Sequence, residues 1–141
     1  DGGRGEVLSC QALYEGQSFY KESGKSGFLH MDGQAVFKFA VRKVPEAILE
    51  VLELNGLTIE DIDWFVVHQA NRRIIESVAR HLGVSLERFP VNLQEYGNTS
   101  AASIPILLDE MRHSGQLKKG QRLVIAGFGA GLTWGASILD C

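Results

Sequence analysis

The spacing of apolar residues in the first third of the chain predicts a strand, a loop and a long helix. Apolar and polar residues alternate from Glu6 to Tyr14, as in a strand with one buried face. The polar stretch from Glu15 to Gly33 is rich in Gly, Ser and Lys, so we expect a long surface loop there. Helical spacing follows from Val36 to Leu52 and ends at Asn55-Gly56. Pro45 lies within it and is expected to kink the helix or split it in two.

The middle of the chain predicts a buried strand followed by a helix. Ile62 to His68 is a nearly continuous apolar run, which is typical of a parallel strand covered on both faces. From Arg72 to Leu82 the apolar residues form one stripe, and Gly83 is expected to end this helix. Val91 to Leu93 is expected to form a short strand.

The last third predicts another helix and a pair of strands. Tyr96-Gly97-Asn98 is expected to turn into a helix over Thr99 to His113, with a bend at Pro105. Two apolar segments predict strands, and they are Leu123 to Ala126 and Leu132 to Leu139. The order of all these elements predicts an α/β fold with helices around a mixed five-stranded sheet, in which the last two strands form a C-terminal hairpin.

Size and composition fit one globular domain. The 141 residues are 45% hydrophobic, enough for a sizeable core, and carry a formal net charge of −3 with both signs mixed. This balance gives no overall attraction to nucleic acid or to an anionic membrane, and no apolar run approaches the length of a membrane span. Because the chain begins with Asp1 and not with Met, we expect a fragment or a processed chain.

The two cysteines do not have the setting of a nucleophile. Cys10 falls on the apolar face of the first predicted strand, and Cys141 is the last residue. Neither stands at the amino end of a predicted helix, where a thiolate would be stabilised. We expect both to be reduced thiols in a cytosol-like compartment.

Three segments follow predicted strands and could share one site. These segments are His68-Gln69-Ala70-Asn71, Gly97-Asn98-Thr99-Ser100 and the glycine-rich turn Gly127 to Gly131. In open α/β sheets ligands bind beyond the carboxyl ends of the parallel strands, so we expect the three segments to converge. A neutral imidazole and a carboxamide would there aim two N–H donors at one oxygen and stabilise an oxyanion or an enolate.

Each of these residues also has a purely structural interpretation. His68 could be a structural or surface histidine, and both Asn98 and Asn71 could cap the helices that follow them. The glycines could merely form a hairpin turn with positive φ. A strand rather than a helix follows them, which disfavours a dinucleotide site. The chain has no G-x-S-x-G elbow, which lowers the case for Ser100 as a nucleophile.

The helix after Asn71 has a polar face with several basic residues. Arg73 and Arg80 lie two turns apart along one side of it, where they could meet an acidic protein or a phosphate. The alternative is a solvated face, since mixed-charge helix faces are commonly exposed.

Four segments in order resemble the β-ketoacyl-acyl carrier protein synthase III family. They are M-D-G-Q-A-V-F-K-F-A-V at 31–41, W-F-V-V-H-Q-A-N-R-R-I at 64–74, Y-G-N-T-S-A-A-S-I-P at 96–105 and G-F-G-A-G-L-T-W-G at 127–135. The H-Q-A-N sequence separates this family from the related chalcone synthases and from the chain-elongating synthases.

The resemblance implies a thiolase-like fold in which residues 1–141 are the carboxyl-terminal domain, one half of a pseudo-symmetric whole. The family has a Cys-His-Asn site, of which His68 and Asn98 would be the second and third members. The cysteine belongs to the amino-terminal half, absent here, and takes an acyl group from coenzyme A. Malonyl-acyl carrier protein is then decarboxylated to attack the acyl-enzyme, which starts fatty-acid synthesis. We therefore expect this chain alone to be inactive.

The resemblance also implies further contacts and partners. Asn71 would touch the pantetheine arm, Phe128 and Gly129 would lie near the acyl site, and Arg73 and Arg80 would dock the acidic carrier protein. No metal and no cofactor are expected beyond coenzyme A thioesters and phosphopantetheine-linked substrates. The complete enzyme is expected to be a homodimer in the cytoplasm or the plastid stroma, and the isolated half to expose an apolar surface.

Two other functions stay open at this point. A polyketide-type starter synthase or another acyltransferase could use the same fold and residues. A non-catalytic domain could keep the pocket and only bind a carrier protein.

Overall fold

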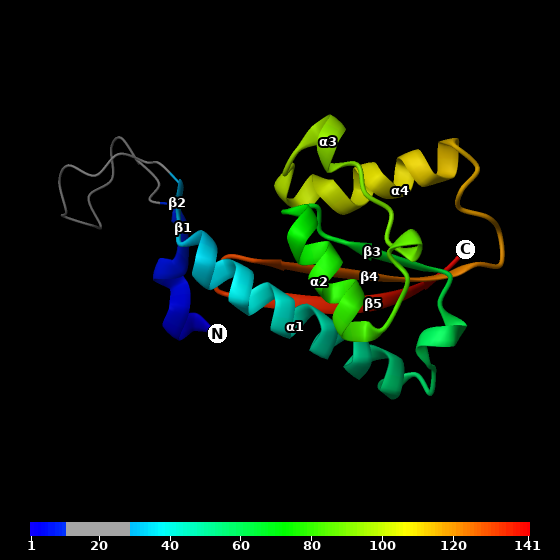
Figure 1. Cartoon of the computed structure of the whole chain (residues 1–141), viewed down its shortest axis with the longest axis horizontal. Helices are drawn as coiled ribbons and strands as arrows, with labels where there is room; N and C mark the ends of the chain where they lie inside the picture. Colours follow the sequence, from blue (N-terminus) through cyan, green and yellow to red (C-terminus); the bar gives the residue numbers. More distant parts are fainter. Residues whose placement is uncertain (11–28) are drawn as a thin grey trace, which may run out of the picture.

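A three-stranded sheet lies at the centre of the structure, a computed structural model that describes residues 1–10 and 29–141. The order in the sheet is β3 (Trp64–Val67), β4 (Arg122–Gly129) and β5 (Thr133–Asp140). β3 and β4 are parallel, with Trp64 opposite Leu123, whereas β4 and β5 are antiparallel, with Leu123 opposite Leu139. β1 (Leu8–Cys10) and β2 (Leu29–Met31) form a separate antiparallel pair (Figure 1).

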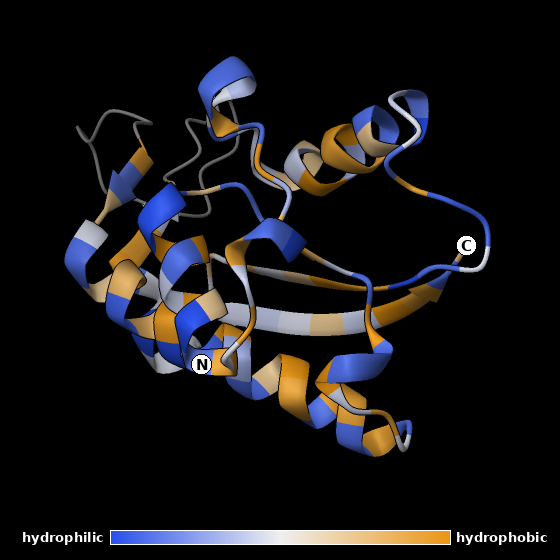
Figure 2. Cartoon of the chain, turned by 45° about the vertical axis from the view of Figure 1, so that its right-hand side comes forward, coloured by the Kyte–Doolittle hydropathy of each residue, from blue (hydrophilic) through white to orange (hydrophobic). Residues whose placement is uncertain are grey.

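Helices cover the two faces of the sheet unequally. One face carries α1 (Gly33–Leu54) and α2 (Arg72–Leu82), and the other carries α4 (Ser103–His113) (Figure 2). The short helix α3 (Leu93–Tyr96) precedes α4 in the chain. Four 3-10 helices complete the described part, and they are Gly2–Val7, Ile59–Asp61, Leu86–Arg88 and Ser100–Ala102. None of the described helices is long and apolar enough to cross a membrane.

The alternation of side chains along β3 divides the core in two. Phe65 and Val67 pack with α1 and α2 in the larger cluster, while Val66 packs with Leu107 and Met111 beneath α4. Phe65 is fully buried, and its ring stacks on Phe89 with centroids 5.0 Å apart. Both faces of β3 are therefore apolar, which explains the continuous apolar run in this part of the sequence.

The structure confirms the α/β class and the C-terminal hairpin, but the sheet differs from the expectation. In the described residues three strands, not five, form the mixed sheet. The first predicted strand is short and pairs with β2 instead of joining the central sheet. This pairing could not be predicted, since alternation identifies a strand but not its partner. The strand expected at Val91 to Leu93 was wrong, since Leu93 begins α3 and Asn92 donates its backbone N–H to the Gln69 side chain.

The amino-terminal predictions were partly wrong. Glu6 and Val7 belong to a 3-10 helix, so only residues 8–10 of the predicted strand are β1 in the described part. Residues 11–28, which include most of the predicted loop, lie outside the described residues. The end of that loop is structured, because Leu29–Met31 is β2 and the Asp32 side chain caps α1.

The two prolines expected to disturb helices do not split them. α1 continues through Pro45, whose ring is buried in the same face as the neighbouring apolar residues. Pro105 is the third residue of α4 and lies in its first turn. A backbone N–H at that position has no partner within the helix, so proline removes no helical hydrogen bond there. The predicted helix from Thr99 to His113 instead divides before Ser103, into the 3-10 helix Ser100–Ala102 and α4.

The glycine-rich turn is also shorter than expected. Gly127 and Gly129 both lie within β4, opposite Gly135 and Thr133 of β5. The connection between the two strands is confined to residues 130–132, and β5 begins at Thr133.

Replacing the glycine that ends α2 should destabilise the chain. Gly83 has φ +68° and a backbone N–H bonded to Ala79 and Arg80 carbonyls, a left-handed cap that an L side chain disfavours. We expect Gly83→Ala to lower the free energy of unfolding by about 1 kcal/mol in urea unfolding. Gly33→Ala is the matched control, because Gly33 begins α1 without positive φ and with no atom within 4 Å of an added Cβ. Equal effects of the two substitutions would contradict the interpretation.

Candidate active site

His68 stands at the point where β3 ends. Its backbone N–H donates to the carbonyl of Ala126 at 2.9 Å, which extends the β3–β4 ladder by one residue beyond Val67. Side chains alternate along the strand, so that His68 falls on the same side as Val66, the side covered by α4. The imidazole thus lies at the carboxyl end of the parallel strands, the position predicted for a site.

Two neighbours hold the His68 ring. Nδ1 lies 2.6 Å from the hydroxyl oxygen of Ser103, the first residue of α4. On another side the ring meets Phe128 edge to face, with centroids 5.3 Å apart and planes at 69°. The ring nitrogen Nε2 makes no hydrogen bond within the described part of the chain. One nitrogen is therefore engaged by protein and the other is available to a ligand.

Burial lowers the pKa of His68 below the ordinary histidine value. Removal from water penalises the imidazolium because the charged form loses its hydration. His68 is accordingly a neutral imidazole near pH 7, a group that can donate one hydrogen bond without carrying a charge.

A network of buried polar residues supports this end of β3. Gln69 donates from Nε2 to the Val67 carbonyl at 2.7 Å, and its Oε1 accepts the backbone N–H of Asn92 at 3.3 Å. Its backbone N–H donates to the Ser103 hydroxyl oxygen at 3.3 Å. The residues Gln69, Asn92 and Ser103 are the buried polar side chains of the described ranges, and none has an unpaired buried polar atom.

Ser103 was not expected at the site, and Gln69 lay in one of the three expected segments without an assigned role. Both were present in the recognised motifs, at 64–74 and 96–105, but neither chain position nor residue type indicated that they meet. A glutamine and a serine inside otherwise apolar elements were the available signal, because buried polar side chains need specific partners.

Asn98 lies in the exposed loop that leads to α4. Its Oδ1 accepts the backbone N–H of Ser100 at 3.0 Å, a side-chain turn and not the cap of α4, whose N-cap residue is Ala102. The loop is constrained, since Gly97 and Ser100 have φ of +67° and +53°. With Oδ1 occupied, the amide nitrogen is the end of Asn98 left for a ligand. The structure contains no hydrogen bond between Asn98 and His68, so their joint role stays a prediction.

Asn71 is the N-cap of α2. Its Oδ1 accepts the backbone N–H of Arg73 at 2.9 Å, which confirms the structural interpretation of this residue. The side chain is exposed, and its amide nitrogen is still free to meet a substrate. The cap and the predicted contact with a pantetheine arm are therefore compatible.

Phe128 and Gly129 end β4 beside His68. Phe128 contacts the imidazole through its ring, as described above, and Gly129 pairs with Thr133 of β5. Both are half-buried. The structure thus brings Phe128 to His68, whereas an acyl contact of either residue stays a prediction.

Arg73 and Arg80 are exposed on α2. The guanidinium carbon of Arg73 lies 5.7 Å from the centre of the Phe37 ring of α1, which restricts the side chain without neutralising it. Neither arginine forms a salt bridge within residues 1–10 and 29–141, whereas Arg72 pairs with Glu76 at 3.0 Å. Two unneutralised cations on one helix face are suited to an acidic partner.

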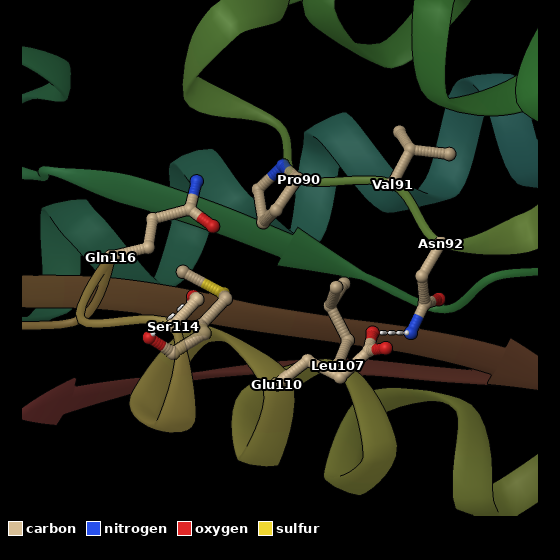
Figure 3. Close-up of a pocket in the computed structure, with 8 residues that line it drawn as sticks. Pro90, Val91, Asn92, Leu107, Glu110, Ser114 and Gln116 are labelled. Atoms are coloured by element: carbon tan, nitrogen blue, oxygen red, sulfur yellow. Dashed lines mark hydrogen bonds between the residues drawn. The ribbon is translucent and has the colours of Figure 1, made fainter.

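A pocket of about 250 Å³ lies elsewhere, beside the carboxyl-terminal half of α4 (Figure 3). Glu110 at its wall accepts hydrogen bonds from the Asn92 amide at 2.6 Å and the Tyr96 hydroxyl at 2.8 Å. The lining residues are Pro90, Val91, Asn92, Leu107, Glu110, Met111, Ser114 and Gln116. None of the residues expected at the site belongs to it, and the described residues contain no cluster suited to a metal ion.

The cysteines are both exposed. Cys10 is the last residue of β1, not a buried residue of an apolar face as expected, and Cys141 ends the chain. Neither belongs to β3, β4 or α4, the elements that carry His68, Phe128 and Ser103.

Solved structures with this arrangement of elements are thiolase-like. The β-ketoacyl-[acyl carrier protein] synthase III of Thermus thermophilus matches with a TM-score of 0.88 and 42% identity over 100% of this chain and 43% of that one. OleA of Xanthomonas campestris matches with a TM-score of 0.81 at 20% identity, a likeness of fold alone. The fold class expected from the sequence is thereby confirmed.

The sequence comparisons identify the family. Residues 52–141 match the family model "3-Oxoacyl-[acyl-carrier-protein (ACP)] synthase III C terminal". The β-ketoacyl-[acyl-carrier-protein] synthase III of Clostridium acetobutylicum is 49% identical over 140 residues, and that of Neisseria gonorrhoeae is 53% identical over 120. The chain belongs to the 3-oxoacyl-[acyl-carrier-protein] synthase III family and corresponds to the carboxyl-terminal part of its members. It covers 43% of the Clostridium relative and 37% of the Neisseria relative.

The lowered pKa of His68 should make stability depend on pH. Between the folded value and the unfolded value of about 6.5, the unfolded state binds more protons, so stability falls as pH drops below about 6.5. Urea unfolding between pH 7.5 and 5 should show this loss in the wild-type chain and a smaller loss in His68→Gln. Identical pH slopes for the two proteins would refute the assignment of a neutral, buried imidazole.

Proposed function

We propose that this chain is the carboxyl-terminal part of an enzyme that condenses an acyl-coenzyme A starter with malonyl-acyl carrier protein, the first step of fatty-acid synthesis. His68 and Asn98 supply the second and third members of a Cys-His-Asn site. The cysteine belongs to an amino-terminal half that is not in this chain. The chain on its own is inactive because it holds two of the three groups.

The state of His68 is the observation that carries this proposal. The imidazole is neutral, held at Nδ1 by Ser103 and open at Nε2, at the carboxyl end of a parallel strand. Such a group can donate a hydrogen bond to a developing negative charge and retain its proton afterwards. A charged imidazolium would tend to transfer that proton and quench a carbanion.

The chemistry assigned to the pair is stabilisation of an enolate. When malonyl thioester loses carbon dioxide, the electron pair of the broken C–C bond moves toward the thioester carbonyl, whose oxygen becomes negative. Nε2–H of His68 and the amide N–H of Asn98 would both donate to that oxygen. The carbon end of the enolate then attacks the carbonyl of the acyl-cysteine thioester, and the cysteine leaves as a thiolate. No metal or cofactor enters these steps beyond the coenzyme A and phosphopantetheine groups of the substrates.

The uncovered side of the hairpin supports a missing half. On the α4 side of the sheet, α4 packs over β3 and β4, whereas Thr133, Gly135 and Ser137 of β5 are exposed. β5 is also the edge of the three-stranded sheet in the described chain. Small side chains on this uncovered face allow a further layer of structure to pack closely against the sheet. The amino-terminal half would pack there, and the complete protein would form a homodimer.

The substrate arm and the carrier protein would approach from the α2 side. Asn71 would contact the pantetheine arm through its free amide nitrogen, while Phe128 and Gly129 would border the acyl site next to His68. Arg73 and Arg80 would meet acidic residues of the carrier protein. Their exposure and lack of a salt-bridge partner in the described chain support this arrangement.

The test uses a chimaera that joins this chain to the amino-terminal half of the Clostridium acetobutylicum relative. The 141-residue chain alone should show neither acetyl transfer nor condensation, whereas the chimaera should show both. In the chimaera, His68→Ala and Asn98→Ala should each lower malonyl decarboxylation by about 100-fold or more, because each removes one donor to the enolate oxygen.

The matched control for this test is His113→Ala, which removes a histidine whose side chain is 76% exposed at the end of α4. It should leave decarboxylation unchanged. Full turnover by the chain alone, or unchanged decarboxylation in His68→Ala, would refute the proposed function. Carrier binding without decarboxylation in the wild-type chimaera would favour a non-catalytic binding domain, and a panel of acyl-coenzyme A starters with malonyl-coenzyme A would identify a polyketide-type starter synthase.

Charge reversal on α2 tests the carrier-protein surface. In the active chimaera Arg73→Glu should raise the KM for malonyl-acyl carrier protein about tenfold, and Arg80→Glu by a smaller factor, with little change in the KM for acyl-coenzyme A. The effect should shrink at high salt, because exposed charges are screened. Arg112→Glu, on α4 across the sheet, is the control and should change neither KM. Equal effects of Arg73→Glu and Arg112→Glu would exclude a specific docking surface.

A further inference from the structure

The contact between His68 and Ser103 constrains where the single proton of the neutral imidazole resides. Nδ1 of His68 and the hydroxyl oxygen of Ser103 are 2.6 Å apart, close enough that one of them must donate to the other. Ser103 is 1% exposed, so its hydroxyl cannot turn to bulk water. The direction of this hydrogen bond decides whether the proton of the imidazole resides on Nδ1 or on Nε2, the nitrogen that faces the site.

The other bonds of Ser103 decide the direction. A hydroxyl has one proton to donate and two lone pairs, and the backbone N–H of Gln69 already occupies one lone pair at 3.3 Å. Within residues 1–10 and 29–141 the hydroxyl makes no hydrogen bond to a carbonyl or carboxylate oxygen. Nδ1 of His68 is therefore the acceptor that this part of the chain offers to its proton.

The opposite arrangement leaves a buried group unpaired. If Nδ1 carried the proton and donated to Ser103, the oxygen would accept from both His68 and Gln69, and the hydroxyl proton would have no partner. A buried donor without an acceptor is costly, and the structure otherwise leaves no buried side-chain polar atom unpaired among the described residues. The doubly protonated imidazolium meets the same obstacle at Nδ1.

We infer that Ser103 is a positioning residue that holds His68 in the tautomer protonated at Nε2. The consequence for catalysis rests on the proposed function: Ser103 keeps Nε2–H of His68 directed at the substrate oxygen as a hydrogen-bond donor. The wrong tautomer would present a lone pair to the developing enolate, which repels it. Gln69 contributes by fixing the Ser103 oxygen from the end of β3, and α4 contributes by carrying Ser103 as its first residue.

The tautomer can be measured directly by ¹⁵N NMR of the imidazole rings in the wild-type 141-residue chain and in the complete chimaera. The signals of His68 are identified by their loss in His68→Gln, since the chain has 4 histidines. At pH 7.5 we expect a pyridine-type Nδ1 and a pyrrole-type Nε2 for His68. A pyrrole-type Nδ1, or two nitrogens averaged to the same shift, would overturn the inference without any mutation of Ser103.

Substitution of Ser103 then tests the positioning role. Ser103→Ala should let the two ring nitrogens average toward each other and should lower kcat for decarboxylation about tenfold or more with little change in KM. Ser103→Thr keeps the hydroxyl and should restore the single tautomer and most of kcat. Ser114→Ala is the matched control, because it removes a hydroxyl from the opposite end of α4, one that donates to the Met111 carbonyl at 3.2 Å. It should change neither readout.

The outcomes separate this inference from the proposed function. An unchanged tautomer and unchanged kcat in Ser103→Ala would refute the role of Ser103, while the dependence on His68 would still stand. Unchanged decarboxylation in His68→Ala would instead refute the proposed function, and the role inferred from it, whatever the spectrum of His68 shows. The expected spectrum together with a loss of kcat in Ser103→Ala and its recovery in Ser103→Thr would support both.

Discussion

The parallel pairing of β3 with β4 is the constraint on which the rest of the structure depends. The ladder from Trp64 and Leu123 to Val67 and Ala126 places the carboxyl ends of two strands side by side, although they are far apart in the chain. His68 adds one more bond to Ala126 and so inherits the position of the strand. Helices α1 and α2 on one face, and α4 on the other, bury the strand on both sides and hold the ladder in place.

The same pairing creates a problem that the buried polar network solves. Gln69 follows β3 and is 1% exposed, so its polar groups cannot turn to bulk water. They bond instead to the Val67 carbonyl, the Ser103 hydroxyl and the Asn92 backbone N–H. A fully paired network in a low-dielectric setting is rigid, because breaking any one bond leaves a buried polar group unpaired. His68 is thus held by a rigid part of the protein, because its partner Ser103 belongs to this network.

Rigidity on one side contrasts with openness on the other. The network, Phe128 and the first residue of α4 enclose one side of the imidazole, while Nε2 of His68 and the amide nitrogen of Asn98 make no hydrogen bond in the described chain. The face of β5 that α4 leaves uncovered is a second open region, and the chain spans less than half the length of the relatives that it matches. The described structure therefore fixes the imidazole from one side and leaves its Nε2 side open.

Local sequence determined the elements whose own residues decide their form. The apolar run at β3, the apolar stripe and glycine cap of α2, and the hairpin of β4 and β5 followed from periodicity and turn chemistry, and motifs along the chain indicated the family and the site residues His68 and Asn98. Tertiary structure alone decided which strand pairs with β1, why Leu93 begins a helix and not a strand, and which hydroxyl contacts His68. The reason is physical: burial patterns and caps depend on neighbours within one or two turns, whereas a strand partner or the partner of a buried hydroxyl comes from a distant segment that the fold must first bring close.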